Sequence, residues 1–243
     1  MIVMEGALSV KAVMQARRRL VERLIIDEKK KDRDTAFILR LARQQGIAVE
    51  RTDRQRIHSL ASGHTHGGIV ALVQPRQYQN VQDCLDQPLP FVAVLEGIED
   101  PYNLGYAFRS LYAAGCSGVL TSARDWSAAE STLVKSSAGA SEWLPWCQCE
   151  NLAESVSALR RQGCVLYCAQ RSPQAIDYFD AQFTQPFILA IGGERRGLGR
   201  EILAQSDQNV VIPYGRSFRA ALNGCSAVAA LSFEVVRQRR NRA

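Results

Sequence analysis

Short apolar runs that end in polar or glycine-containing turns recur along the C-terminal part of this chain of 243 residues. They occupy residues 91–97, 118–122, 164–170, 187–193 and 209–214. Helical patterns separate most of them, at residues 108–115, 129–139, 151–163 and 222–240. Strands that are apolar along their whole length are buried on both faces, and helices between them form parallel crossovers. The pattern therefore predicts an α/β fold with a mostly parallel sheet.

The N-terminal part is predicted to form a separate, smaller αβ domain. An amphipathic helix is expected over residues 7–23, where apolar residues recur near helical spacing. Strands are expected at residues 24–27, 47–51 and 69–73, and helices at residues 35–46 and 53–60. Residues 74–90 contain three prolines and no long apolar stripe, which is typical of a linker. We therefore expect a domain at 1–76, a linker at 77–90 and a second domain at 91–243.

Positive charge is concentrated in the first of these domains. The whole chain has a net charge of +6, from 30 basic and 24 acidic residues. Residues 1–76 contain 15 basic and 8 acidic residues, whereas residues 77–243 contain 15 and 16. A basic domain favours a polyanionic partner such as RNA, and the acidic balance elsewhere suggests a different task for the rest.

The composition also limits the location and the metal chemistry that we expect. No apolar run reaches the ~18–20 residues of a membrane span, and the N-terminus has no signal-peptide pattern, so we expect a cytoplasmic protein. The seven cysteines lack the spacing of a zinc site and are expected to be reduced and mostly buried. His58, His64 and His66 lie close in sequence, but their spacing is not specific for a metal. We expect no metal.

The first motif follows the apolar run at 91–97. Asp100, Pro101, Asn103 and Gly105 form a turn that leads into a helix, and Arg109 lies one to two turns further on. Open α/β sheets bind their ligands at this end of a strand. A simple turn with a surface arginine is the alternative.

The second motif follows the run at 187–193. Gly192, Gly193 and Gly197 allow a ligand to approach the backbone closely, and Glu194 stands among arginines. The loop lacks the Lys-Ser/Thr ending of a nucleotide-binding P-loop. A strand-to-helix turn, with Glu194 in a salt bridge, is the alternative.

The third motif follows the run at 209–214. It contains Ile212, Pro213, Leu222 and Asn223, and an alanine-rich helix follows. Asn223 taken alone is typical of the first residue of a helix.

Taken together, the three motifs resemble those of the SpoU (TrmH-like) branch of the SPOUT RNA methyltransferases. They read Asp-Pro-x-Asn-x-Gly-x-x-x-Arg, Gly-x-Glu-x-x-Gly and Ile-Pro followed by Leu-Asn. The resemblance extends over nearly the whole chain. Residues 6–76 resemble the family's ribosomal-protein-like substrate-binding domain at 6–10 and 66–71, and residues 135–140 resemble a stretch common between the first two motifs.

The resemblance implies a C-terminal α/β knot, a trefoil knot with a mostly parallel sheet, and methyl transfer from S-adenosylmethionine to a ribose 2′-hydroxyl of RNA. It implies a homodimer. It also implies catalytic roles for Asn103, Arg109, Glu194 and Asn223. The residues that it implies for cofactor binding are Gly192, Gly193, Gly197, Ile212, Pro213, Leu222 and Asn223. Because a free guanidinium stays protonated, we expect Arg109 to bind the adjacent phosphate rather than to act as a base.

The third motif departs from the family pattern. Ala221 stands where relatives commonly have serine, and Gly224 and Cys225 stand where they have valine and serine. Four readings follow from the sequence: an rRNA methyltransferase, a tRNA methyltransferase, an RNA-binding protein with weakened or lost transfer, and a module that works through residues 1–76 alone. The auxiliary domain favours the first of these.

Overall fold

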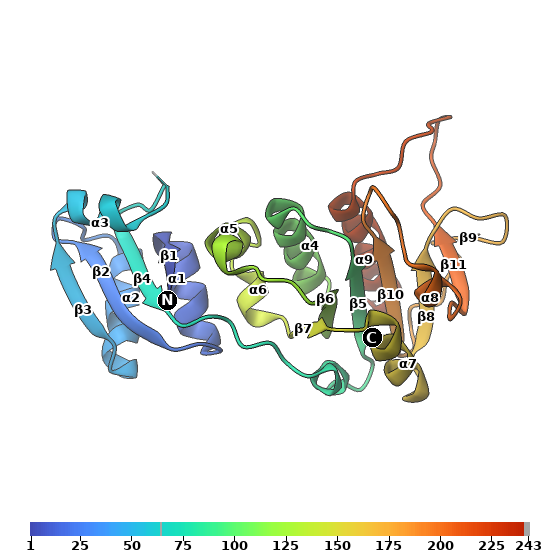
Figure 1. The fold of residues 1–243 in the computed structure, drawn as a ribbon, viewed down its shortest axis with the longest axis horizontal. Helices are drawn as coiled ribbons and strands as arrows, with labels where there is room; N and C mark the ends of the chain where they lie inside the picture. The colour runs from blue at the N-terminus through green and yellow to red at the C-terminus, as the bar shows by residue number, and fades with distance from the viewer. Residues whose placement is uncertain (64, 241–243) are drawn as a thin grey trace. The chain divides into compact units, whose positions relative to one another are not determined.

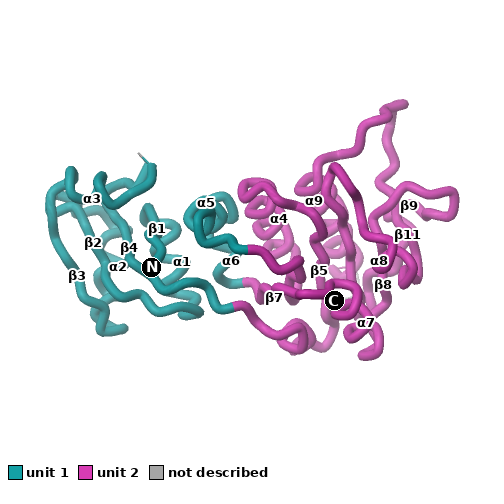
Figure 2. The backbone as a smooth tube through the Cα atoms, in the orientation of Figure 1, with its two compact units in different colours: residues 1–77, 125–143 teal, residues 78–124, 144–243 magenta. Residues whose placement is uncertain are grey.

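The protein is described by a computed structural model that places residues 1–63 and 65–240. The chain folds into two compact units (Figure 2). Unit 1 contains residues 1–77 and 125–143, and unit 2 contains residues 78–124 and those from 144 onward. The segment 125–143 lies inside the predicted second domain at 91–243, yet it belongs to the N-terminal unit.

Unit 1 has a four-stranded mixed sheet (Figure 1). In spatial order its strands are β1 (Ile2–Glu5), β4 (Ile69–Val73), β2 (Val21–Asp27) and β3 (Ala48–Thr52). Strand β4 is antiparallel to both neighbours, and β2 is parallel to β3. The helices of this unit are α1 (Gly6–Ala16), α2 (Arg33–Gln45), α3 (Arg54–Leu60), α5 (Glu130–Ser136) and α6 (Ala140–Trp143), with a 3-10 turn at η2 (Ser127–Ala129).

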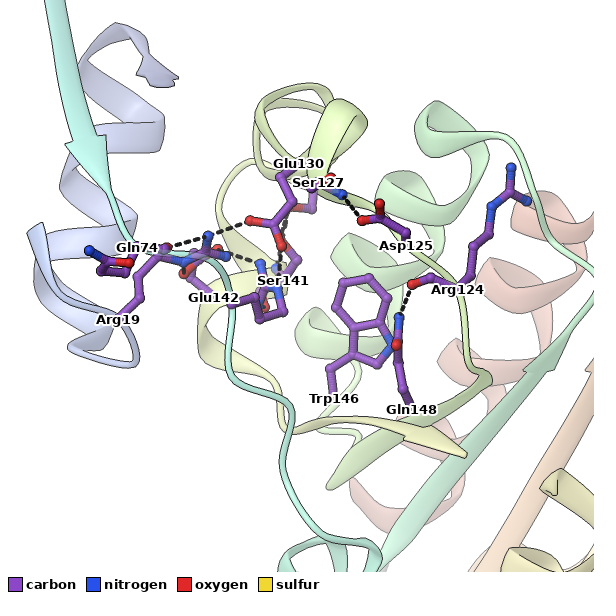
Figure 3. Close-up of polar contacts among 12 residues, drawn as sticks. Arg19, Gln74, Arg124, Asp125, Ser127, Glu130, Ser141, Glu142, Trp146 and Gln148 are labelled. Atoms are coloured by element: carbon purple, nitrogen blue, oxygen red, sulfur yellow. Dashed lines mark hydrogen bonds and ion pairs between the residues drawn. The ribbon is translucent and has the colours of Figure 1, made fainter. Parts of the chain in front are cut away.

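A buried ionic cluster, formed by Arg19, Arg76, Glu130 and Glu142, ties the segment 125–143 into unit 1 (Figure 3). Arg19 donates two hydrogen bonds to the Glu142 carboxylate, at 3.2 and 2.8 Å, and also contacts Glu130. All four side chains are at most 4% exposed. Burial alone would lower the pKa of Arg19, but the charges of Glu142 and Glu130 outweigh burial and raise it. Arg19 therefore keeps its positive charge inside the cluster.

Unit 2 is built on seven parallel strands (Figure 1). In spatial order they are β7 (Trp146–Cys149), β6 (Gly118–Ser122), β5 (Phe91–Glu96), β10 (Phe187–Gly192), β8 (Val165–Ala169), β11 (Gln208–Val211) and β9 (Ile176–Asp177). The helices are α4 (Pro101–Ala113), α7 (Leu152–Arg161), α8 (Arg200–Leu203) and α9 (Gly224–Arg240), with a 3-10 helix at η1 (Val81–Leu85).

Helices cover both faces of this sheet. Val92 and Val94 of β5 share one buried cluster with α7 and α8. Successive strand residues point to opposite faces, so Phe91, Ala93 and Leu95 face the other side, where α4 and α9 lie next to one another. The predicted α/β fold with a mostly parallel sheet is confirmed.

Several predicted elements differ in their bounds. The first helix ends at Ala16, because Arg17 adopts a left-handed conformation (φ 54°) and the apolar stripe continues into β2 instead. The helix expected at 108–115 begins earlier, at Pro101, where Asp100 caps it. The helix expected at 129–139 is broken between α5 and α6, because Ala138 and Gly139 both have positive φ. Strands β1, β7 and β9 were not expected from the sequence.

In the part of the chain that the structure describes, no helix is both long and apolar enough to cross a membrane.

Candidate functional site

The three motifs all leave the same edge of the sheet of unit 2. Because the strands are parallel, the carboxyl ends of β5, β10 and β11 lie at one edge. Strand β10 pairs directly with β5, and β8 lies between β10 and β11. In open α/β sheets this edge, where neighbouring crossovers diverge, is where ligands bind.

The first motif places Asn103, but not Arg109, beside a cavity. The Asp100 carboxylate accepts a hydrogen bond from the Asn103 backbone N–H at 2.8 Å and so starts α4. Asn103 lines a cavity of about 380 Å³. Arg109 follows six residues later on α4, about 9 Å along the helix axis and on a different face. Its side chain is exposed and makes no hydrogen bond or ion pair among residues 1–63 and 65–240.

The second motif needs its glycines for close backbone contacts. The Gly193 N–H donates to the Glu96 carbonyl at 2.7 Å, and the Gly197 N–H donates to the Gly193 carbonyl at 2.9 Å. A Cβ atom on Gly192 would collide with the backbone of Gly197, and one on Gly193 would collide with the carbonyl of Gly97. The loop therefore folds back tightly on the loop after β5.

Glu96 is a residue of this site that the sequence reasoning missed. It ends the otherwise apolar strand β5, and its Oε2 accepts the Gly199 N–H at 2.7 Å. This bond ties the second motif to the end of β5. The sequence feature that could have indicated Glu96 is its position as a single carboxylate at the end of an otherwise apolar strand.

Glu194 lies in the open part of the same loop. It is exposed, and within the described parts of the chain it makes no ion pair with the neighbouring arginines. The salt bridge that was considered as an alternative is therefore not present. Glu194 lines both cavities of this edge.

The third motif closes the site from the other side. Ile212 and Leu222 line a second cavity, whereas Pro213 and Asn223 line neither cavity. Asn223 caps α9: its Oδ1 accepts the Ser226 N–H at 2.8 Å, and its carbonyl accepts the Ala227 N–H at 3.1 Å. Asn223 therefore lies at the start of a helix, as its residue type alone suggested.

Cys225 joins the first and third motifs. Its Sγ lies 3.3 Å from Asn223 Oδ1 and 3.7 Å from Asn103 Oδ1. A thiol is a weak hydrogen-bond donor, so the contact aligns the two amides without strongly polarising either. The serine that relatives commonly have here is replaced by a group that still reaches both asparagines.

The second cavity has a volume of about 310 Å³ and apolar and glycine-rich walls. Its lining comes from the ends of β8, β10 and β11 and from the start of α9: Ala169, Gln170, Arg171, Ile191, Gly192, Gly193, Glu194, Gly197, Val210, Val211, Ile212, Tyr214, Ala221, Leu222, Gly224 and Ala227. It shares Gly193, Glu194 and Gly224 with the cavity that Asn103 lines. An apolar chamber therefore adjoins a polar one.

The histidines and cysteines do not form a metal centre in the described parts of the chain. Nδ1 of His58 lies 3.4 Å from Nε2 of His66, while His64 lies outside the described residues. No group of three or more metal-binding side chains occurs among the residues that the structure places. All seven cysteines are free thiols, and burial raises the pKa of Cys116 to about 12.

Comparison with known families agrees with this geometry. A model of the SpoU rRNA methylase family matches residues 90–233, and one described as RNA 2′-O ribose methyltransferase substrate binding matches residues 3–79. The sheet, the three loops and the match over more than half of the chain define a SPOUT-type methyltransferase fold. The chain belongs to the SpoU methylase family, as its motifs predicted.

Individual relatives match over most of their length. The 23S rRNA (guanosine-2′-O-)-methyltransferase RlmB of Photobacterium profundum is 30% identical over 240 residues, which are 96% of each chain. The crystal structure of the SpoU methyltransferase AviRb from Streptomyces viridochromogenes has a TM-score of 0.82 and 25% identity, and covers 99% of this chain and 90% of AviRb. AviRb has also been solved in complex with AdoMet, with a TM-score of 0.80 to this chain at 24% identity, over 98% of this chain and 90% of AviRb.

Proposed function

We propose that this protein transfers a methyl group from S-adenosylmethionine to a ribose 2′-hydroxyl of structured RNA, with rRNA as the substrate. The observation that carries the proposal is the apolar cavity of about 310 Å³, which residues of the second and third motifs line. Its polar neighbour, lined by Asn103, opens from the same loops. The site offers one chamber for a cofactor and an adjoining polar one for the ribose.

The residues of the apolar chamber fit S-adenosylmethionine. The volume lies at the lower end of the ~300–1,000 Å³ of small-molecule sites. Gly192, Gly193 and Gly197 line the chamber without side chains, so a ligand can approach the backbone closely, and Ile212 and Leu222 offer apolar contacts for an adenine ring. We assign cofactor binding to these five residues. Pro213 lies in the loop that follows β11, and Asn223 acts through its cap on α9.

The chemistry asks the protein to orient a weak nucleophile. The sulfonium of the cofactor supplies an activated methyl group, so we propose that no metal takes part. Asn103 and Glu194 line the polar chamber and orient the ribose hydroxyl through hydrogen bonds. Arg109, exposed on α4, binds the adjacent phosphate, and its positive charge favours loss of the hydroxyl proton.

Unit 1 supplies the RNA contact in this proposal, and the domain at residues 1–76 is joined to the transferase domain at 91–243 through a linker at 77–90. Several exposed cations of unit 1 lie in the segments that follow β2 and β3. We call this group the basic edge; it consists of Lys29, Lys31, Arg33, Arg54 and Arg56. Arg51 of β3 holds the segment at the end of β2, because its Nη1 donates to the carbonyls of Asp27 and Lys30 at 2.9 and 3.2 Å. Phosphate groups are the natural partner of such an edge.

The active form is proposed to be a cytoplasmic homodimer. Large aromatic side chains remain exposed on α4 and α9, namely Tyr102, Tyr106, Tyr112 and Phe233. Adjacent exposed aromatics favour a protein interface. Analytical ultracentrifugation should find a dimer, and Phe233→Glu should shift it to monomer; a wild-type monomer at micromolar concentration would refute this part of the proposal.

The decisive experiment maps 2′-O-methyl groups by mass spectrometry in rRNA and tRNA from cells with and without the protein. A single rRNA site that disappears with the gene supports the proposal, and a lost tRNA site would replace rRNA as substrate. If no site is lost, calorimetry with S-adenosylmethionine tests whether the protein binds the cofactor at all. No binding at millimolar cofactor would indicate an RNA-binding protein without transfer.

A further inference from the structure

The loop between β11 and α9, residues 212–223, is long and mostly exposed, yet it forms one wall of the apolar chamber. Arg216, Ser217, Phe218 and Arg219 are all exposed, and Phe218 keeps 59% of its surface accessible. The loop contains no helix or strand. Something other than a helix or strand must hold this wall in place.

Two side chains, Arg171 and Tyr214, hold the loop. The Tyr214 hydroxyl accepts the backbone N–H of Leu222 at 2.9 Å, which closes the loop between its two ends. The Arg171 guanidinium carbon lies 4.4 Å from the centre of the Tyr214 ring. Arg171 Nη1 also donates to the Arg219 carbonyl at 3.4 Å.

Arg171 reaches the loop from a different segment. It follows β8, which ends at Ala169, so the contact joins the carboxyl ends of β8 and β11 across the mouth of the chamber. Arg171, Tyr214 and Leu222 all line that chamber. A planar guanidinium stacks on an aromatic ring and donates in its own plane at the same time, which an ammonium group cannot do.

We propose that Arg171 and Tyr214 form a clamp that positions the loop 212–223, and through it the backbone of Leu222, for cofactor binding. The clamp rests on the proposed function, because it assigns these residues to the cofactor chamber. It makes Arg171 and Tyr214 positioning residues that set cofactor affinity. The reacting groups are left to Asn103, Arg109 and Glu194.

The test compares four variants of the full-length protein with the wild type. Arg171→Gln removes the stacked cation, Arg171→Lys keeps the charge without the plane, and Tyr214→Phe keeps the ring but not the acceptor for Leu222. Arg216→Gln is the matched control: Arg216 lies in the same loop and makes no hydrogen bond or ion pair in the described residues. Thermal unfolding of each variant confirms that it is folded.

Calorimetry with S-adenosylmethionine gives the first readout. The loss of a cation–aromatic contact at a partly exposed site predicts a Kd about fivefold weaker for Arg171→Gln. Tyr214→Phe should weaken binding similarly, Arg171→Lys should fall between, and Arg216→Gln should match the wild type. In steady-state assays the KM for the cofactor should rise while kcat stays within about twofold.

Cleavage by chymotrypsin after Phe218, without cofactor, gives a readout that does not depend on binding. The loop should be cut faster in Arg171→Gln and Tyr214→Phe than in the wild type or Arg216→Gln. Wild-type affinity and wild-type cleavage in Arg171→Gln would overturn the clamp, as would an equal loss of affinity in Arg216→Gln. A wild-type protein that does not bind S-adenosylmethionine would instead refute the proposed function, and the cleavage rates would still decide whether the clamp exists.

Discussion

Unit 1 and the motif edge of unit 2 use charged side chains in opposite ways. In unit 1, the side chains of Arg19, Arg76, Glu130 and Glu142 are buried and form ion pairs with one another. At the motif edge, Arg109 and Glu194 are exposed and form no ion pair among the residues that the structure describes. Buried charges that are paired define which segments pack together, whereas exposed charges without partners remain available to a substrate.

The buried ionic cluster also determines which experiments can separate the function of unit 1 from that of unit 2. Deleting residues 1–76 would remove Arg19 and Arg76 and leave Glu130 and Glu142 without their partners. A truncated protein would then fail for reasons of folding, and its loss of RNA binding would say little about the RNA contact. Point variants on the surface are the sharper tool.

The largest expected effect is on the stability of unit 1. Glu142→Ala should lower the free energy of unfolding by about 3–5 kcal/mol, because two buried guanidinium groups lose a partner. Denaturant titration followed by circular dichroism measures it. The control is Lys11→Gln, which breaks the exposed pair with Asp34 and should cost less than about 1 kcal/mol. Equal losses in both variants would mean that the buried cluster is no different from a surface pair.

The next effect is on catalysis at the motif edge of unit 2. Arg109→Ala should lower kcat at least about 100-fold, as expected for losing a charge that stabilises the transition state. Its affinity for S-adenosylmethionine should not change, because Arg109 lines neither cavity. Arg161→Ala, an exposed arginine at the end of α7, serves as the control. A fully active Arg109→Ala enzyme would contradict the assigned role.

A smaller effect is expected from the basic edge of unit 1. The double variant Arg33→Gln, Arg56→Gln should weaken binding of an unmodified rRNA transcript. The slope of log K against log salt concentration should become shallower by roughly 1.5, because each lost phosphate contact removes about 0.7–0.9. Arg43→Gln is the control, because Arg43 lies on the same helix about 15 Å from Arg33. If Arg43→Gln reduces the slope as much, RNA does not use this edge.

The smallest effect concerns the pH dependence of unit 1. A hydrogen bond from Lys30, followed by those from Thr35, holds the pKa of Asp32 below its ordinary value of 3.8. The folded-state pKa is lowered, so the ionised carboxylate stabilises the fold above pH 3.8, and this contribution is lost as the pH falls through the folded-state value. Because Asp32 is exposed, the contribution is small.

Asp32→Asn separates this titration from the helix cap. Asparagine keeps an oxygen that can accept the Thr35 N–H, so stability at pH 7 should change little. The difference in stability between wild type and variant should shrink as the pH falls below 3.8, as measured by urea unfolding from pH 2 to pH 7. A constant difference over this range would show that the Asp32 charge does not contribute.

The chemistry of the motif edge was largely predictable from the sequence. Gly192, Gly193 and Gly197 follow an apolar strand directly, and their need for close backbone approach is a local property that a pattern can reveal. The family resemblance added the cofactor and the reaction. Glu96 and the contact of Cys225 with Asn103 were missed, because each involves a partner about one hundred residues or more away in the chain.

The sequence by itself determined the parallel sheet, the order of the three loops and the family, because these depend on short patterns of apolar and glycine residues. Only the tertiary structure decided that residues 125–143 belong to unit 1, that Arg109 stands outside both cavities, and that Arg171 holds the loop 212–223. The physical reason is the distance along the sequence over which each kind of interaction acts. A strand or turn is chosen by its neighbours in sequence, whereas a buried ion pair or a stacked guanidinium depends on which distant segments the fold brings together.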